Sequence, residues 1–302
     1  MRGWWLMLTA VGGVAGYLAG TPQEVAPQCL ISGSRPHVGM VWVAPGRFRM
    51  GSEEFRAEEA PRVEQSVAGF WIDPTDVTNA QFARFVGETG YVTVAERVDA
   101  TTGRQAGSLV FKMPEQVTGA GDPGLWWSVM PGADWRHPTG AGSVSQGDHP
   151  VVHVAYEDAA TYARWAGHDL PSEAQWEFAA RAGRDDAFIW GKDADPDAKF
   201  ANHWRGSFPL QPLGVVGTSP VGCYQPNELG LYDMTGNVWQ WTSAPWTASH
   251  ASGPADPTAY VIKGGSFLCA TNFCLRYRPA ARQPGDAGSG ASHIGFRTVF
   301  NP

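Results

Sequence analysis

Two cysteines that lie five residues apart, Cys269 and Cys274, place the strongest constraint on how this chain can fold. As an extended strand, five residues would span roughly 16 Å. A disulfide needs the two Cα atoms within roughly 7 Å, and two thiolates on one metal ion need a similar approach. If the two sulfurs act together, the backbone must therefore curl between them. Thr271 and Asn272, together with the preceding Gly264–Gly265 pair, suit such a bend.

A close pair of thiols has three chemical interpretations, and the spacing alone leaves all three open. The pair can be a structural disulfide, a redox-active disulfide or a site for a soft metal ion. Two thiolates without a nearby histidine or further cysteine make a poor zinc site, because zinc takes four ligands. They suit Cu(I), which is soft and accepts low coordination.

Short motifs surround these cysteines in order. A Gly-Gly-Ser turn at 264–266 precedes the pair, and Arg-Tyr-Arg at 276–278 and Gly-Phe-Arg at 295–297 follow it. Upstream lie Asp-Val-Thr-Asn at 76–79, Asp-Trp-Arg-His-Pro at 134–138, Leu-Pro-Ser-Glu at 170–173 and Asp-Met-Thr-Gly-Asn-Val-Trp-Gln-Trp at 233–241. From about residue 40 to about residue 300, this series resembles the formylglycine-generating enzymes, also called sulfatase-modifying factors. The cysteine pair and residues 134–138 point to the true generating enzymes, whereas several of the other motifs specify only the wider fold.

The resemblance implies a loop-rich α+β fold with little regular secondary structure, related to the C-type lectins. Composition agrees, since glycine and proline (37 and 23 residues) make up about a fifth of the chain and 14 tryptophans supply large core side chains. We expect one domain over residues 38–302, acting as a monomer. The net charge of −7 and the lack of a Lys/Arg-rich run argue against a nucleic acid partner.

Three segments carry helix signals, and each is expected to be scaffold. Capping boxes begin two of them, and a glycine is expected to end the last two. The helices are expected to follow Thr78, to run from Tyr156 to Ala166 before Gly167, and to run from Ser172 to Gly183. Apolar runs at 41–43 and 260–262 predict strands, and residues 40–51 resemble the family's opening hairpin.

The N-terminal segment has the pattern of an export signal. Met1 and Arg2 are followed by an uncharged apolar run from Gly3 to Ala19. A basic start and an apolar stretch of this length are typical of a signal peptide or an uncleaved signal-anchor. We therefore expect residues 1–28 to be such a signal with a short tail, and the protein to act outside the cytoplasm. Cys29 and Cys223 are the remaining cysteines and could form a disulfide there.

The resemblance also implies a copper-dependent oxidase. Cys269 and Cys274 would hold Cu(I), and Ser266 would lie beside the oxygen pocket. The substrate would be a cysteine in the C-x-P-x-R motif of an unfolded sulfatase polypeptide, whose thiolate would join the copper ion as a third ligand. Molecular oxygen and a thiol reductant would complete the conversion of this cysteine to the aldehyde Cα-formylglycine. The residues expected to contact the substrate are Trp135, Arg136 and Asp99.

Structural calcium is a second implication of the resemblance. The matching positions are Asp233, the carbonyl groups of Gly236 and Val238, and Gln240, which stands where the family usually has glutamate. A second family site would use Asn202 and the carbonyl group of His203. We do not expect that site to bind calcium, because the following loop from Leu210 to Gly217 is short and contains no aspartate.

Three further residues near the cysteines have expected roles. Arg276 and Arg278 are expected to brace the loop through carboxylate pairs rather than to touch oxygen. His293 stands where the family has asparagine, which changes the wall of the pocket.

Other functions remain alternatives. A noncatalytic binding module on the same fold would not need the paired cysteines. A non-haem iron sulfoxide synthase would need a histidine-rich site on a partner helical domain, and the sequence has no such histidine cluster. A thiol oxidoreductase would cycle dithiols without any sulfatase peptide.

Overall fold

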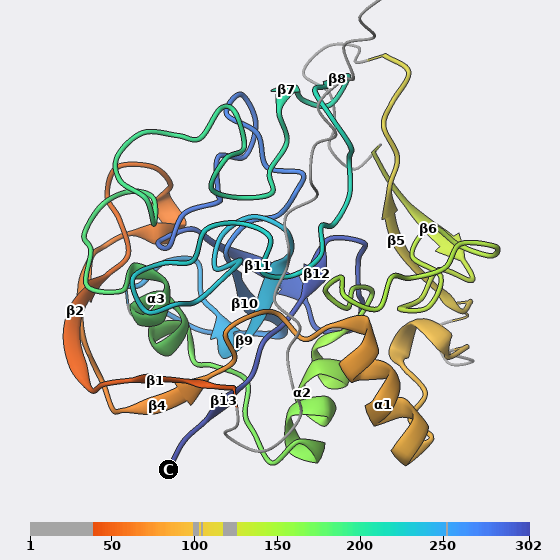
Figure 1. Ribbon diagram of the computed structural model, residues 1–302, viewed down its shortest axis with the longest axis horizontal. Coiled ribbons are helices and arrows are strands. Elements are labelled where there is room, and N and C mark those ends of the chain that lie inside the picture. The colour runs from red at the N-terminus through yellow and green to blue at the C-terminus, as the bar shows by residue number, and fades with distance from the viewer. Residues whose placement is uncertain (1–38, 99–102, 104, 117–125, 252) are drawn as a thin grey trace, which may run out of the picture.

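Figure 1 shows the computed structural model, which describes residues 39–302 except 99–102, 104, 117–125 and 252. In this part of the chain, three α-helices and many short strands are joined by long loops, which confirms the predicted loop-rich α+β fold. No helix among the described residues is long and apolar enough to cross a bilayer. The expected signal at residues 1–28, together with Cys29 and Asp99, lies outside the described residues.

A four-stranded sheet lies in the middle of the molecule (Figure 1). Its strand order is β11-β10-β9-β12, and β12 runs parallel to β9 while the other neighbours are antiparallel. The bounds are β9 Trp239–Trp246, β10 Asp256–Lys263, β11 Arg282–Asp286 and β12 Ile294–Gly295. The strand expected at 260–262 lies within β10. The loop with both cysteines connects β10 to β11, so the central sheet fixes both of its ends.

Smaller sheets surround this centre. β1 (Val41–Val43), β4 (Phe70–Ile72) and β13 (Val299–Phe300) form a three-stranded antiparallel sheet. Three antiparallel pairs complete the set: β2 (Gly46–Met50) with β3 (Val63–Val67), β5 (Gly107–Phe111) with β6 (Trp127–Pro131), and β7 (Gly206–Ser207) with β8 (Gln211–Pro212). The hairpin expected at 40–51 is wrong, because β1 and β2 pair with β4 and β3 rather than with each other.

The three helices form where their local signals predict. α1 (Asn79–Thr89) begins with a capping box between Thr78 and Gln81 and ends at Gly90 in the left-handed conformation. α2 (Tyr156–Trp165) stops just before Gly167, as expected. α3 (Glu173–Arg181) also starts with its capping box but ends before Gly183, because Ala182 already adopts the left-handed conformation with φ 48°. Two single turns of 3₁₀ helix complete the set, η1 (Ala57–Glu59) and η2 (Val94–Glu96).

The core combines large aromatic rings with buried ion pairs. Phe82, Phe85 and Tyr162 from α1 and α2 pack with Trp239 and Trp241 of β9 in the main hydrophobic cluster. Aromatic side chains of this size bury more apolar area than aliphatic ones, so a fold with short elements can still fill its core.

Charged groups lie beneath α3 and tie it to the central sheet. The Lys263 ammonium donates to Glu177 at 2.9 Å, and the Arg282 guanidinium donates to Glu173 at 2.7 Å. Burial alone would raise the pKa of Glu173, but the hydrogen bond from His250 and the charges of Lys263 and Arg282 lower it to about 2. These pairs anchor β10 and β11, the two strands that carry the cysteine loop.

Candidate active site

The cysteine loop folds back on itself, as the spacing of the two sulfurs requires. Ala270 and Phe273 exchange backbone hydrogen bonds of 2.8 and 3.2 Å, which closes a tight turn between the cysteines. Cys274 and Leu275 then have positive φ angles of 72° and 48°, a conformation that is uncommon for residues with side chains. The result brings the thiols of Cys269 and Cys274 into hydrogen-bond contact, and both cysteines are free. Strained backbone at such a site is typical of a functional constraint.

The two thiols differ in acidity. Burial opposes ionisation of Cys269, but the hydrogen bond from Cys274, backbone hydrogen bonds at Ser266 and Arg276, and the charge of Arg276 lower its pKa below the ordinary value. The hydrogen bond to Cys269 and burial raise the pKa of Cys274 well above the ordinary value. Cys269 therefore loses its proton first, and Cys274 donates to the resulting thiolate. A soft cation bound by both sulfurs would displace that second proton.

A cavity of about 410 Å³ opens at the cysteine pair. Aromatic side chains form part of its wall, namely Phe111, Trp126, Trp127, Phe208 and Phe273, and polar or charged residues such as Arg56 and Arg276 line the rest. The Phe208 and Phe273 rings are stacked with centroids 4.4 Å apart, and Trp126 meets both edge-on. The sequence interpretation missed this wall, for which the adjacent tryptophans 126 and 127 were the available signal. The aromatic part of such a cavity can receive an apolar part of a peptide next to the thiols.

Buried arginines brace the loop through carboxylates, as expected. Arg278 makes two hydrogen bonds of 2.9 and 2.5 Å to Glu59, and its Nε donates to the carbonyl oxygen of Leu275 at 2.8 Å. Arg276 pairs with Glu58 and also faces the cavity. The segment that contains η1 therefore holds the cysteine loop from outside.

Ser266 lies at the start of the loop and lines the cavity. It is fully buried, its hydroxyl oxygen accepts a hydrogen bond from the Leu268 N–H at 3.3 Å, and its carbonyl oxygen accepts one from the Cys269 N–H at 2.9 Å. The hydroxyl therefore shapes the turn at the start of the loop.

The structure does not bring the other expected substrate contacts to the cysteines. Trp135 is buried in the main core, where it packs edge-on against Phe82 with centroids 5.2 Å apart. Arg136 lies over the Trp135 ring at 4.0 Å and donates to Glu96 at 2.6 Å. Neither side chain lines the cavity. In these positions Trp135 contributes to core packing, and Arg136 stacks on Trp135 and forms an ion pair with Glu96.

Two histidines lie at one side of the cavity, the half-buried His293 in its wall and the fully buried His153 in the core. His293 lines the cavity and stacks on Trp127 with ring centroids 4.5 Å apart. Burial, with a contribution from the charge of His153, lowers the pKa of His293 to about 3. His153 is fully buried and bonds the carbonyl oxygen of Pro138 at 2.8 Å, and burial lowers its pKa to about 4. Both rings are therefore neutral in the folded protein near neutral pH.

The buried His153 should make the protein less stable in mild acid. Below the ordinary pKa of 6.5, the unfolded chain takes up a proton on this ring, whereas the folded protein does not until about pH 4. Stability is therefore lost as the pH falls through 6.5. We expect His153→Asn, which tolerates the φ of 61°, to remove this dependence. Between pH 6.5 and pH 5, the free energy of unfolding of the wild-type protein should fall by about 2 kcal/mol more than that of the variant, measured by urea denaturation. If the free energies of unfolding of the two proteins fell equally with pH, the result would contradict this account.

Asp233 and Gln240, two of the expected calcium ligands, lie close together, but only one of them has a side-chain oxygen free to bind a cation. The Gln240 side-chain oxygen accepts hydrogen bonds from Trp176 at 2.7 Å and from Arg297 at 2.8 Å, so it has no lone pair left for a cation. Asp233 Oδ2 accepts from the Gly222 N–H, but its Oδ1 is buried without a partner. Gly236 and Val238, the carbonyl positions, lie in the same turn, and Val238 is fully buried.

Asp76 is a neighbour of Asp233 that the sequence interpretation missed. Both of its carboxylate oxygens are buried without a hydrogen-bond partner. Burial raises the pKa of Asp76 well above the ordinary value, Arg297 opposes this, and the charge of Asp233 adds to it. Burial also raises the pKa of Asp233 to about 6. Unpartnered hard oxygens of this kind fit a calcium ion, although the described residues contain no group of three or more acidic, histidine or cysteine side chains around one point.

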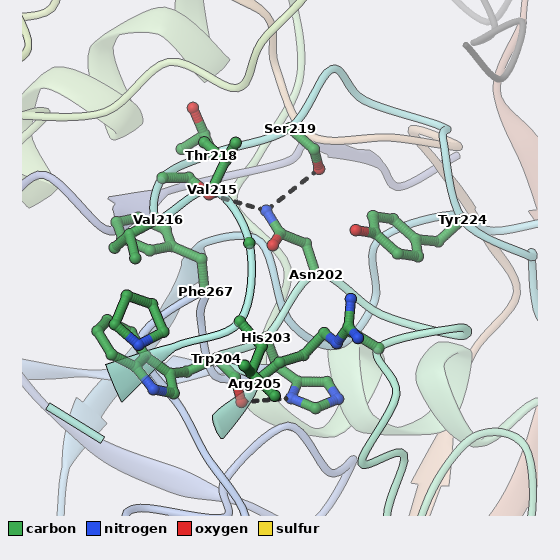
Figure 2. Close-up of a pocket in the computed structure, with 15 residues that line it drawn as sticks. Asn202, His203, Trp204, Arg205, Val215, Val216, Thr218, Ser219, Tyr224 and Phe267 are labelled. Carbon is green, nitrogen blue, oxygen red and sulfur yellow. Dashed lines mark hydrogen bonds between the residues drawn. The ribbon is translucent and has the colours of Figure 1, made fainter. Parts of the chain in front are cut away.

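The second calcium region does not fit the ion. The Asn202 amide nitrogen donates to the Gly217 carbonyl oxygen at 3.0 Å and to Ser219 at 3.3 Å (Figure 2). His203 is buried, and its ring bonds the Trp204 carbonyl oxygen at 3.1 Å. Among the described residues, those that line this cavity include no carboxylate, and they include the cationic Arg205.

Comparison with known proteins gives the family. Residues 30–302 match the family model described as "Sulfatase-modifying factor enzyme 1-like domain". The chain is 46% identical to the formylglycine-generating enzyme of Mycobacterium tuberculosis over 287 residues, which cover 85% of this chain and 96% of the relative. It is 35% identical to a Bos taurus protein named inactive C-alpha-formylglycine-generating enzyme 2, over 88% of this chain and 89% of the relative. The solved structure of PvdO from Pseudomonas aeruginosa aligns with a TM-score of 0.60 and 25% identity, over 87% of this chain and 94% of that one. The chain therefore belongs to the sulfatase-modifying factor family of formylglycine-generating enzymes.

Proposed function

We propose that this protein oxidises a cysteine of a sulfatase polypeptide to Cα-formylglycine, with oxygen as the oxidant and a thiol as co-reductant. The carbon–sulfur bond of the substrate breaks and a carbon–oxygen double bond forms. One oxygen atom enters the aldehyde and the other leaves as water, while sulfur leaves as hydrogen sulfide. The thiol reductant supplies the two electrons and two protons that complete this balance. The observation that carries the proposal is the free cysteine pair, in hydrogen-bond contact at a cavity, with Cys269 buried and Cys274 half-buried.

The same pair fits a copper ion. Cys269 and Cys274 present two soft sulfurs that approach each other, and the positive charge of Arg276 lowers the pKa of Cys269 and also acts against the rise at Cys274. When bound by these residues, Cu(I) would supply the one-electron chemistry that allows a thiol substrate to react with oxygen. The chain itself buries Cys269, holds the first thiolate there and would position the peptide against the aromatic wall.

We further propose that Asp233 and Asp76 hold a structural calcium ion. Their oxygens without hydrogen-bond partners support this proposal, although Asp76 Oδ1 also lies 3.6 Å from the Arg297 guanidinium, and backbone carbonyl groups such as those of Gly236 and Val238 would have to complete the ligand set. Action outside the cytoplasm remains our proposal from the apolar run at residues 3–19.

A noncatalytic binding module is the alternative, and the inactive relative from Bos taurus gives it weight. Such a module would bind a peptide without changing it. The paired, free and strained cysteines favour the enzyme, because a binding surface has no need to hold two thiols in contact.

The proposed activity can be tested with a short peptide. The sequence Leu-Cys-Thr-Pro-Ser-Arg would be incubated with the protein, Cu(I), oxygen and dithiothreitol and then analysed by mass spectrometry. We expect a mass loss of about 18 Da at the cysteine, because CH₂SH becomes CHO. If the peptide stays unchanged although the protein binds Cu(I) in a 1:1 ratio, the protein uses a different peptide substrate or a different electron acceptor. Unchanged peptide and no copper binding would leave the binding module.

A further inference from the structure

A second, apolar cavity of about 320 Å³ lies beside the cysteine cavity, and we call it the valine groove. It is defined by Val144, Val215, Val216, Pro138 and Phe267. Val144 is 82% exposed and Val215 is 97% exposed, and Val216 beside it is 38% exposed. Apolar side chains that gather in a hollow at the surface are typical of a binding site, whereas scattered ones are not.

The valine groove adjoins the cysteine cavity. Phe111, at the end of β5, lines both of them. Ser292 lines the groove while His293, the next residue, lines the cysteine cavity. Phe267 lines the groove between Ser266 and Leu268, which line the cavity. The two hollows thus share Phe111, and neighbouring residues of two other segments line one hollow or the other.

We propose that the valine groove binds apolar side chains of the sulfatase polypeptide that flank the modified cysteine. This rests on the proposed function, which places the substrate cysteine at Cys269 and Cys274. The polypeptide must continue beyond the cysteine cavity on both sides of the modified residue, and the groove that shares Phe111 with this cavity is its neighbour. An extended chain advances about 3.3 Å per residue, so positions a few residues away from the cysteine reach the neighbouring hollow. An unfolded polypeptide offers apolar side chains that a folded partner would keep in its own core.

The groove can be tested by peptide binding without any turnover. Two fluorescent peptides would carry serine in place of the reactive cysteine: the core Leu-Ser-Thr-Pro-Ser-Arg, and the same core with three leucines on each side. We expect the wild-type protein to bind the extended peptide at least about tenfold more tightly. The variant Val215→Ser/Val216→Ser should lose about tenfold in affinity for the extended peptide and change little for the core, measured by anisotropy.

A matched control uses two other exposed valines. Val92 and Val98 are 50% and 61% exposed and lie outside the groove, so Val92→Ser/Val98→Ser should bind both peptides like the wild-type protein. Equal affinity of the wild-type protein and the Val215/Val216 variant for the extended peptide would overturn the proposal. The proposal would also be overturned if the Val215/Val216 variant lost self-association in sedimentation velocity while its peptide affinity stayed unchanged. The groove would then bind a second copy of the chain. Aldehyde formation on the cysteine-containing core peptide, measured in parallel, shows separately whether the proposed function fails.

Discussion

Replacement of Cys269 or Cys274 by serine is expected to abolish aldehyde formation, with a fall in rate on the order of 1,000-fold or more. A serine hydroxyl is a hard, weakly acidic group and a poor ligand for a soft ion. It also cannot form the thiol–thiolate contact that lowers the pKa of Cys269. Since each sulfur depends on the other, both single variants and the double variant should be equally inactive. Turnover is measured by mass spectrometry on the short cysteine peptide.

The comparison must separate lost chemistry from lost folding. Cys269 is buried and serine is close to it in size, so the melting temperature is measured beside the rate for each variant. Thr271→Ser is the matched control, because Thr271 lies in the same turn but is exposed and does not line the cavity. The control should keep the wild-type rate and bind Cu(I) in a 1:1 ratio, whereas each cysteine variant should not. A folded serine variant with more than about a tenth of the wild-type rate would contradict the role of the pair.

Local signals in the sequence predicted the parts of the fold that depend on local contacts. The capping boxes at Thr78 and Ser172 begin helices because their hydrogen bonds lie within four residues of chain. The curl between the cysteines followed from the reach of the backbone alone. The end of α3 was misplaced because Ala182 takes a left-handed conformation that sequence assigns to the following glycine.

Contacts between distant segments could not be predicted in this way. β1 pairs with β4 across a span that holds two other strands, and only tertiary packing selects that partner. The aromatic wall gathers residues from β5, β6 and two later loops at the cysteines. Asp76 was taken only as part of a helix entry, because nothing local shows that its carboxylate faces Asp233. Phe273 of the aromatic wall lies in the cysteine loop itself, but Phe111, Trp126, Trp127 and Phe208 come from elsewhere in the chain.

The buried pair between Glu59 and Arg278 predicts the largest effect on stability. Both side chains are almost completely buried, and Arg278 also holds the carbonyl oxygen of Leu275, next to Cys274. Glu59→Gln would leave the guanidinium charge in the core without a carboxylate. We expect the free energy of unfolding to fall by about 3–5 kcal/mol, measured by urea denaturation. Aldehyde formation should also fall at temperatures where the variant is folded, because the cysteine loop loses its outer support.

Two comparisons isolate the buried charge as the cause. Glu157→Gln breaks an ion pair with Arg97 of similar length, 3.0 Å, but this pair is exposed, so the cost should stay below about 1 kcal/mol. Adding Arg278→Met to Glu59→Gln removes the unpaired charge and should restore about 1 kcal/mol or more relative to Glu59→Gln alone. If the double variant is instead less stable than Glu59→Gln, the packing and the Leu275 hydrogen bond of Arg278 outweigh its charge. In that case η1 supports the cysteine loop through shape rather than through the ion pair.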